Sequence, residues 1–242
     1  MQAKVLSNTK LADRTQKITL SRPAGYTYRP GDYLTIPFAG VKRYLSIVSS
    51  PHEPQLELTV RTSDSPFKQY LMNLEQDQTV ELSAAKGTLG YVAGDASSLV
   101  VLAGGIGITP FVSIVRYLAQ QSTNEVPPLT ILHANRYASE AAYKEELTKL
   151  ARLKPRLTYK TFFSQEPYSN RITTADVAEA INDHPDCTLL IAGSHQFISG
   201  MYDHLSQLGV APDRVSAEVF CGYCSEHECC CDHITYGVAC AH

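Results

Sequence analysis

The stretch Leu99–Pro110, with the sequence LVVLAGGIGITP, constrains the fold of this 242-residue chain more than any other. Its first four residues are apolar, which predicts a strand buried on both faces, as in a parallel sheet. Glycines follow where the strand ends, and Pro110 suits a first helical turn, where its missing N–H costs nothing. A glycine turn at a helix N-terminus suits a pyrophosphate, although a tight turn without any ligand is the alternative. The turn also departs from the G-x-G-x-x-G fingerprint, because Pro110 replaces the last glycine.

Composition excludes several classes of protein. The chain carries a net charge of −3 without a basic run, so we do not expect a nucleic acid partner. No apolar segment is long enough to span a bilayer, and the N-terminus lacks the apolar core of a signal peptide. We therefore expect a cytoplasmic protein with no membrane span. The length allows one large domain or two modest ones.

The chain divides into two parts with different sequence patterns. Residues 1–94 show short alternating segments separated by turn residues, which predicts an antiparallel β-barrel with one helix at Phe67–Leu74. The expected strands are Ala3–Leu6, Lys17–Leu20, Tyr33–Pro37, Tyr44–Val48, Leu56–Arg61 and Thr79–Leu82.

Residues 95–220 alternate strand and helix patterns, which predicts an α/β domain with a parallel sheet. The expected strands are Leu99–Ala103, Leu129–Ala134, Leu157–Phe163, Thr188–Ala192 and Ser216–Phe220. The expected helices are Pro110–Gln121, Glu140–Leu153, Thr174–Ile181 and Ser199–Leu208. The predicted fold class is therefore a two-domain α+β protein, a barrel followed by an α/β domain.

The segment Arg43–Pro51, RYLSIVSSP, is too polar for a core strand. A guanidinium at Arg43 and a hydroxyl at Ser46 suit a ligand that carries a phosphate, and an ordinary edge strand is the alternative.

Four motifs in order, RYLSIVSSP, GGIGITP, IAGSHQF and AEVF, resemble those of the ferredoxin–NADP reductase superfamily over residues 3–220. The resemblance implies that the barrel binds a flavin and the α/β domain a nicotinamide dinucleotide. It further implies hydride transfer from the nicotinamide to the flavin, which then passes electrons, often singly, to an acceptor.

On the flavin side, the resemblance assigns Arg43 to a flavin phosphate and Ser46 to the neighbourhood of flavin N5. Leu45 stands where the family has a stacking aromatic residue, with Tyr44 one place earlier. Lys68 favours FAD over FMN, although a solvated lysine is the alternative. The remaining flavin residues that the resemblance implies are Thr59, Val60, Arg61, Pro66 and Phe67.

On the nucleotide side, the resemblance implies that a glycine turn holds the pyrophosphate and that residues 193–194 lie beside the nicotinamide. Arg136 favours NADPH over NADH, because an arginine there binds a 2′-phosphate; a surface arginine is the alternative. The resemblance implies that Phe220 covers the flavin and that Glu218 moves protons. The alternatives are a core aromatic residue at position 220 and a salt-bridged acid at position 218. The implied catalytic residues are Ser46, Glu218 and Phe220, and the nucleotide residues are Gly105, Gly107, Thr109, Pro110, Arg136, Gly193 and Ser194.

The tail, residues 221–242, does not belong to that pattern. It concentrates cysteines that bind soft metals, and it has few large apolar residues. We weigh a 2Fe-2S cluster, a structural zinc ion and a metal-free thiol or disulfide tail. The candidate ligands are Cys221, Cys224, Cys229, Cys230, Cys231 and Cys240.

The resulting hypothesis is an NAD(P)H-dependent flavoprotein reductase with FAD. Its acceptor is unknown: a small redox protein such as ferredoxin or flavodoxin, or ferric iron in a chelate. The alternatives are a flavin or ferric-siderophore reductase, and a non-catalytic electron-transfer subunit.

Overall fold

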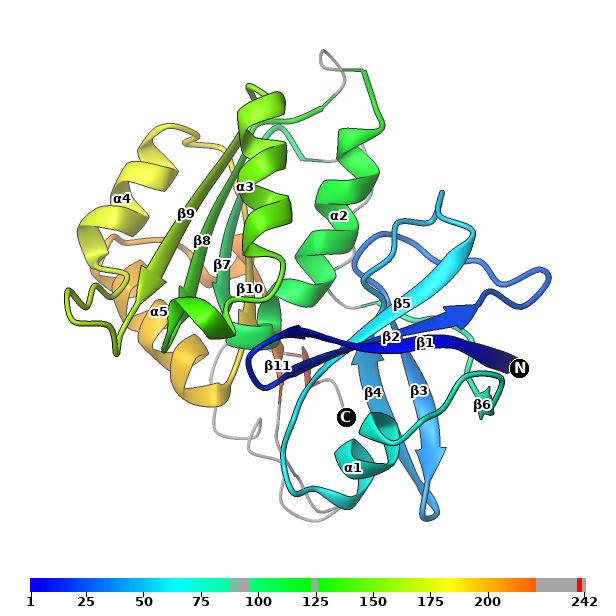
Figure 1. Cartoon of the computed structure of the whole chain (residues 1–242). Helices are drawn as coiled ribbons and strands as arrows, with labels where there is room; N and C mark the ends of the chain where they lie inside the picture. Colours follow the sequence, from blue (N-terminus) through cyan, green and yellow to red (C-terminus); the bar gives the residue numbers. More distant parts are fainter. Residues whose placement is uncertain (88, 90–95, 123–125, 221–238, 241–242) are drawn as a thin grey trace.

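A computed structural model describes residues 1–87, 89, 96–122, 126–220 and 239–240 (Figure 1). The first part of the chain is antiparallel. Four strands form one sheet in the order β5-β2-β1-β6, and β3 and β4 form a hairpin. These strands are β1 (Gln2–Ala12), β2 (Thr15–Ser21), β3 (Tyr33–Phe38), β4 (Val41–Ser46), β5 (Gln55–Arg61) and β6 (Thr79–Glu81).

The hairpin closes against the sheet into a barrel-like unit. An isolated bridge joins Ile47, just past β4, to Leu58 of β5, and another joins Tyr33 of β3 to Lys86. The apolar residues of these strands point inward and form one core, which the helix α1 (Pro66–Met72) completes with Phe67 and Leu71. Alternation of apolar and polar residues thus produces the antiparallel half of the predicted fold.

The second part is a parallel sheet with helices on both faces. Its strand order is β12-β11-β10-β7-β8-β9, and every neighbouring pair is parallel. The strands are β7 (Leu99–Gly104), β8 (Leu129–Asn135), β9 (Leu157–Phe163), β10 (Thr188–Gly193), β11 (Val215–Val219) and β12 (Ala239–Cys240). The helices are α2 (Thr109–Ala119), α3 (Lys144–Leu153), α4 (Thr174–Asn182) and α5 (His195–Gln207).

The central strand β7 is buried on both faces, as its apolar run predicts. Val101 faces the core with α2 and α3, whereas Val100 and Leu102 face the core with α4 and α5. The predicted fold class, an antiparallel barrel followed by an α/β unit, is confirmed. Residues 90–95, where the predicted boundary between the domains falls, lie outside the described residues, so that boundary stays a prediction.

Several predicted element ends are wrong for local reasons. The helix expected from Glu140 begins at Lys144, because Tyr143 takes a left-handed φ of 59° and residues 138–140 form a separate 3₁₀ turn. The helix expected from Ser199 begins at His195, because the Ser194 side chain accepts a hydrogen bond from the Phe197 N–H and caps it.

The first strand is also longer than expected. It runs past the alternating segment to Ala12, and its polar second half stays paired with β2 through register shifts. Within the part of the chain that the structure describes, no helix combines the length and apolarity that crossing a bilayer requires. The expected cytoplasmic location stays a prediction.

A buried network joins the two halves. Arg116 of α2 donates to Glu146 of α3 through Nε at 2.7 Å, and its Nη2 lies 3.3 Å from a carboxylate oxygen of Glu57 in β5. The Tyr143 hydroxyl donates to Glu57 at 2.8 Å and contacts the hydroxyl of Thr59. Side chains from the barrel and from the α/β unit therefore form one connected network of ion pairs and hydrogen bonds.

Candidate functional site

A cleft of about 990 Å³ lies between the barrel and the carboxyl edge of the parallel sheet. Ligands of α/β proteins bind at this edge, because the strand ends and helix N-termini converge there. The cleft brings together most of the residues singled out in the sequence. These are Tyr44, Leu45, Ser46, Thr59, Val60, Arg61, Lys68, Gly105, Thr109, Arg136, Gly193, Ser194, Glu218 and Phe220.

The barrel contributes an aromatic pair and two cations to the cleft. The rings of Tyr33 and Tyr44 lie 5.4 Å apart on β3 and β4, and Ser46 ends β4 beside them. Arg61 at the end of β5 forms an ion pair with Glu140 at 2.7 Å. Burial, followed by the charge of Arg61, lowers the pKa of Lys68 in α1. Since no carboxylate among the described residues pairs with Lys68, it is available to an anion.

The glycine turn lies opposite, between β7 and α2. Gly105 has a φ of 56°, a conformation that favours glycine, and a Cβ there would come within 3.6 Å of Arg61 Nη1. A Cβ at Gly107 would lie 2.3 Å from the backbone oxygen of Ala192 in β10. The turn thus contains glycine for two reasons. Gly105 adopts a left-handed backbone conformation, and Gly107 packs against the neighbouring strand β10.

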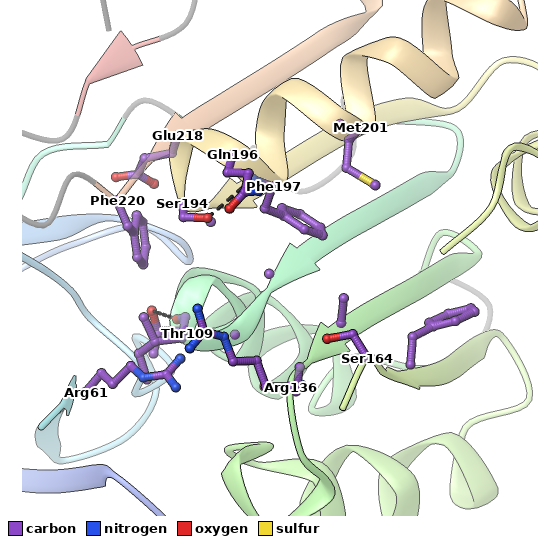
Figure 2. Close-up of a pocket in the computed structure, with 18 of the residues that line it drawn as sticks. Arg61, Thr109, Arg136, Ser164, Ser194, Gln196, Phe197, Met201, Glu218 and Phe220 are labelled. Atoms are coloured by element: carbon purple, nitrogen blue, oxygen red, sulfur yellow. Dashed lines mark hydrogen bonds between the residues drawn. The ribbon is translucent and has the colours of Figure 1, made fainter. Parts of the chain in front are cut away.

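The ends of β8 and β9 carry polar groups that sequence reasoning missed. Asn135 is buried, and its side-chain Nδ2 has no hydrogen-bond partner among the described residues. Ser164 follows β9 and also lines the cleft, next to the predicted Arg136 (Figure 2). Their position at the carboxyl end of a parallel strand was a usable signal, because such ends meet at the ligand-binding edge.

The other end of the cleft holds a buried acid. Glu218 of β11 is 1% exposed, and neither of its carboxyl oxygens has a hydrogen-bond partner among the described residues. Burial, with a smaller contribution from the Asp32 charge, raises its pKa to about 8. Figure 2 shows Glu218 beside Phe220 and Ser194. Glu218 is therefore a neutral carboxylic acid at pH 7, and not the salt-bridged acid of the alternative interpretation.

Other predicted residues lie outside the cleft lining. Phe67 is buried in the barrel core, whereas Arg43 pairs across the hairpin with Ile36. Neither Pro66 at the start of α1 nor Gly107 and Pro110 around the start of α2 lines the cleft. Their assigned roles in cofactor binding stay predictions.

The candidate metal ligands are not tested by the structure. Cys221, Cys224, Cys229, Cys230 and Cys231 lie outside the described residues. Of Cys240, only the backbone in β12 is described, paired with Val219.

The groups in the cleft fit a flavin and a dinucleotide. Lys68 has no carboxylate partner among the described residues, so its ammonium group suits a phosphate. The side-chain amide nitrogen of Asn135 and the carboxyl oxygens of Glu218 need polar partners that the described residues do not supply. A barrel and a parallel sheet that share such a cleft define the class of two-domain flavin and nicotinamide-nucleotide proteins.

Comparison with known proteins agrees with this class. Residues 101–203 match the family model described as the oxidoreductase NAD-binding domain. A ferredoxin reductase component of 3-ketosteroid-9-alpha-monooxygenase from Mycobacterium tuberculosis is 30% identical over 207 residues, which cover 82% of this chain and 56% of that protein. A flavohemoprotein from Bordetella pertussis is 28% identical over 218 residues, covering 80% of this chain and 53% of that protein.

Solved structures share the whole fold. The FAD/NAD-binding domain of a nitric oxide dioxygenase from Vibrio cholerae superposes with a TM-score of 0.78 at 23% identity, covering 90% of this chain and 98% of that one. A ferredoxin–NADP reductase from Neisseria gonorrhoeae with bound FAD and NADP superposes with a TM-score of 0.71 at 20% identity, covering 86% of this chain and 91% of that one. In sequence and in fold, the chain is similar to the ferredoxin–NADP reductase superfamily. It spans about half the length of the curated relatives it matches.

Proposed function

We propose that this chain is an NAD(P)H-dependent flavoprotein reductase that binds FAD against the barrel and passes electrons to a separate acceptor. The observation that supports the proposal is the shared cleft, whose lining combines barrel residues expected to bind a flavin with the glycine turn and the end of β10. A bound flavin supplies hydride acceptance from a nicotinamide and release of electrons one at a time.

The residues of the chain divide the work of binding. Lys68 and Arg61 offer positive charge to phosphates from the barrel side. Gly105 and Thr109 line the turn for the pyrophosphate, while Ser194 and Gly193 form the end near the nicotinamide. These residues would hold a flavin and a nicotinamide in one cleft, where fixing their relative orientation would contribute to the rate.

Glu218 holds a proton beside this place. Glu218 is a buried acid that lines the cleft, and it would donate the proton that a bound flavin takes up when a hydride reduces it. Phe220 lines the same end of the cleft and adds an apolar ring to it. Ser46 from the barrel adds a hydroxyl as a hydrogen-bond donor.

NADPH is the proposed coenzyme. Arg136 follows β8 and lines the cleft, which Ser164 and Arg171 also line, and no Asp or Glu occurs in the sequence between residues 133 and 138 to bind ribose hydroxyls. A guanidinium and a hydroxyl together suit a 2′-phosphate. NADH is the alternative outcome of the test.

Anaerobic stopped-flow mixing tests the proposal. Protein loaded with FAD is mixed with NADPH or NADH, and the visible flavin band is followed before and after ferricyanide, ferredoxin, flavodoxin, a ferric chelate or free flavin is added. We expect bleaching within seconds and reoxidation by at least one acceptor. Retained flavin that neither nucleotide reduces would instead identify a non-catalytic electron-transfer subunit, and rapid reoxidation by free flavin or a ferric siderophore would favour that reductase class.

We propose as a second function that the tail binds a 2Fe-2S cluster which takes single electrons from the flavin. The supporting observation is β12, whose residue Ala239 pairs with Glu218 of the cleft, so the chain returns to this edge of the sheet after the cysteine-rich segment. A structural zinc ion and a metal-free tail are the competing outcomes.

Elemental analysis and cysteine variants test the cluster. Anaerobically purified protein should contain iron and inorganic sulfide, with absorption beyond the flavin bands. Cys224→Ser should lower the iron content, whereas Cys187→Ala, a substitution in the core beside α5, should leave it unchanged. Truncation after Phe220 should slow reduction of a one-electron acceptor while hydride transfer persists. Zinc without iron, or unchanged acceptor rates, would refute the redox role.

A further inference from the structure

His133 is completely buried on β8 and lies directly behind the glycine turn. It is 0% exposed, and both of its ring nitrogens have partners. Nε2 lies 2.9 Å from the carbonyl oxygen of Gly105, and Nδ1 lies 2.9 Å from the hydroxyl of Tyr159 on β9. His133 does not line the cleft itself, but its ring hydrogen-bonds to Gly105, which does.

These partners determine the tautomer of the imidazole. A carbonyl oxygen only accepts hydrogen bonds, so Nε2 must carry the proton that it donates to Gly105. Nδ1 then accepts a hydrogen bond from the hydroxyl of Tyr159. Burial lowers the pKa of His133 to about 4, so the ring is neutral at physiological pH and holds this one tautomer.

The hydrogen bond also orients the next peptide unit. The carbonyl of Gly105 points at His133, and in a trans peptide the following N–H points the opposite way. That N–H belongs to Ile106, which lines the cleft, and the first N–H groups of a helical turn have no partner within it. The bond to His133 thus turns a backbone donor toward the ligand.

We infer that His133 is a positioning residue for the pyrophosphate of the nicotinamide dinucleotide. It acts through Gly105, whose left-handed backbone would otherwise be free to rotate this peptide. Tyr159 holds the imidazole but does not itself orient the turn. The inference rests on the proposed function, because it takes the dinucleotide as the ligand of the cleft.

Three variants separate positioning from packing. His133→Leu removes the donor to Gly105, His133→Gln retains an N–H at a similar reach, and Tyr159→Phe removes only the partner behind the ring. Calorimetry on the FAD-loaded protein measures the dissociation constants of NADP⁺ and NAD⁺. Flavin absorbance and thermal unfolding are recorded for each variant.

We expect His133→Leu to weaken both nucleotides by about tenfold, the size of one lost hydrogen bond to a charged group. Both should suffer equally, because both carry the pyrophosphate. His133→Gln should restore binding to within about threefold. Tyr159→Phe should lower the melting temperature but leave both dissociation constants unchanged.

Opposite results would overturn the inference. A folded His133→Leu protein that binds both nucleotides as tightly as the wild type would refute it, as would equal losses in His133→Leu and Tyr159→Phe. Nitrogen-15 NMR of the wild type gives a check that needs no variant, since protonation at Nδ1 instead of Nε2 would also refute it. A wild type that binds neither nucleotide would overturn the proposed function and this inference together.

Discussion

Replacement of Glu218 by glutamine should remove a pH dependence from the stability of the fold. The carboxyl group has a pKa of about 8 in the folded chain, against an ordinary value of 4.5 for glutamate. Between these values the folded state keeps a proton that the unfolded state releases. Stability from this group is fully present below pH 4.5 and is lost as pH rises through about 8.

The slope gives the magnitude. One extra proton in the folded state lowers the free energy of unfolding by about 1.4 kcal/mol for each pH unit, so about 3 kcal/mol is lost between roughly pH 5 and pH 7.5. Glu218→Gln keeps the shape of the neutral acid but cannot ionise, so its unfolding free energy should lack this contribution. The variant should therefore overtake the wild type in stability toward pH 8.

Urea unfolding of the FAD-loaded protein at fixed ionic strength and fixed flavin concentration measures the difference. The exposed carboxylate of Glu179 on α4 supplies the control, because Glu179→Gln should leave the slope of the wild type unchanged. Parallel curves for the wild type and Glu218→Gln would show that Glu218 is ionised in the fold. The buried, unpaired acid would then be the wrong description of this end of the cleft.

Three further perturbations test other parts of the site. Arg43→Ala should weaken FAD retention by about 2 kcal/mol if Arg43 binds a flavin phosphate, and unchanged copurified flavin would remove it from the site. Arg136→Ala should raise the KM for NADPH far more than that for NADH, with the exposed Arg152→Ala as control; equal effects would make Arg136 a bystander. Arg116→Met should lower the free energy of unfolding by about 3 kcal/mol, because Glu57 and Glu146 lose the cation that they share. Urea unfolding measures this change, and an unchanged midpoint would show that the network adds nothing to stability.

Local sequence patterns were enough to predict the two halves of the fold. The apolar run Leu99–Leu102 predicted a strand buried on both faces, and the core on each side of β7 confirms it. Strands β7 to β11 were all expected close to their observed positions. Periodicity works here because the spacing of apolar side chains along a strand shows which of its faces pack against a core.

The errors came where tertiary contacts override local preference. No propensity predicts a left-handed Tyr143, which the structure holds through its hydroxyl contacts with Thr59 and Glu57 on another part of the chain. The unpaired state of Glu218 was likewise invisible, because the sequence does not say which cations lie near a buried strand end. The sequence also does not show the partner of His133, which only its distance to Gly105 in the structure identifies.

The charges along the cleft explain how a dinucleotide would be oriented in it. Arg61 and Arg136 line it from the barrel and from β8, and Figure 2 shows their side chains pointing toward one another near Thr109. At the other end, Glu218 carries no charge at pH 7, and Phe220 adds an apolar ring. Phosphates are therefore attracted to the cationic part, whereas an uncharged reduced nicotinamide meets no buried negative charge at the acidic end. If Glu218 were ionised, that end would instead attract the oxidised, cationic nicotinamide and hold the product. In the proposed function, Glu218 would therefore have to regain a proton after donating it, because its carboxylate would otherwise retain the oxidised nucleotide.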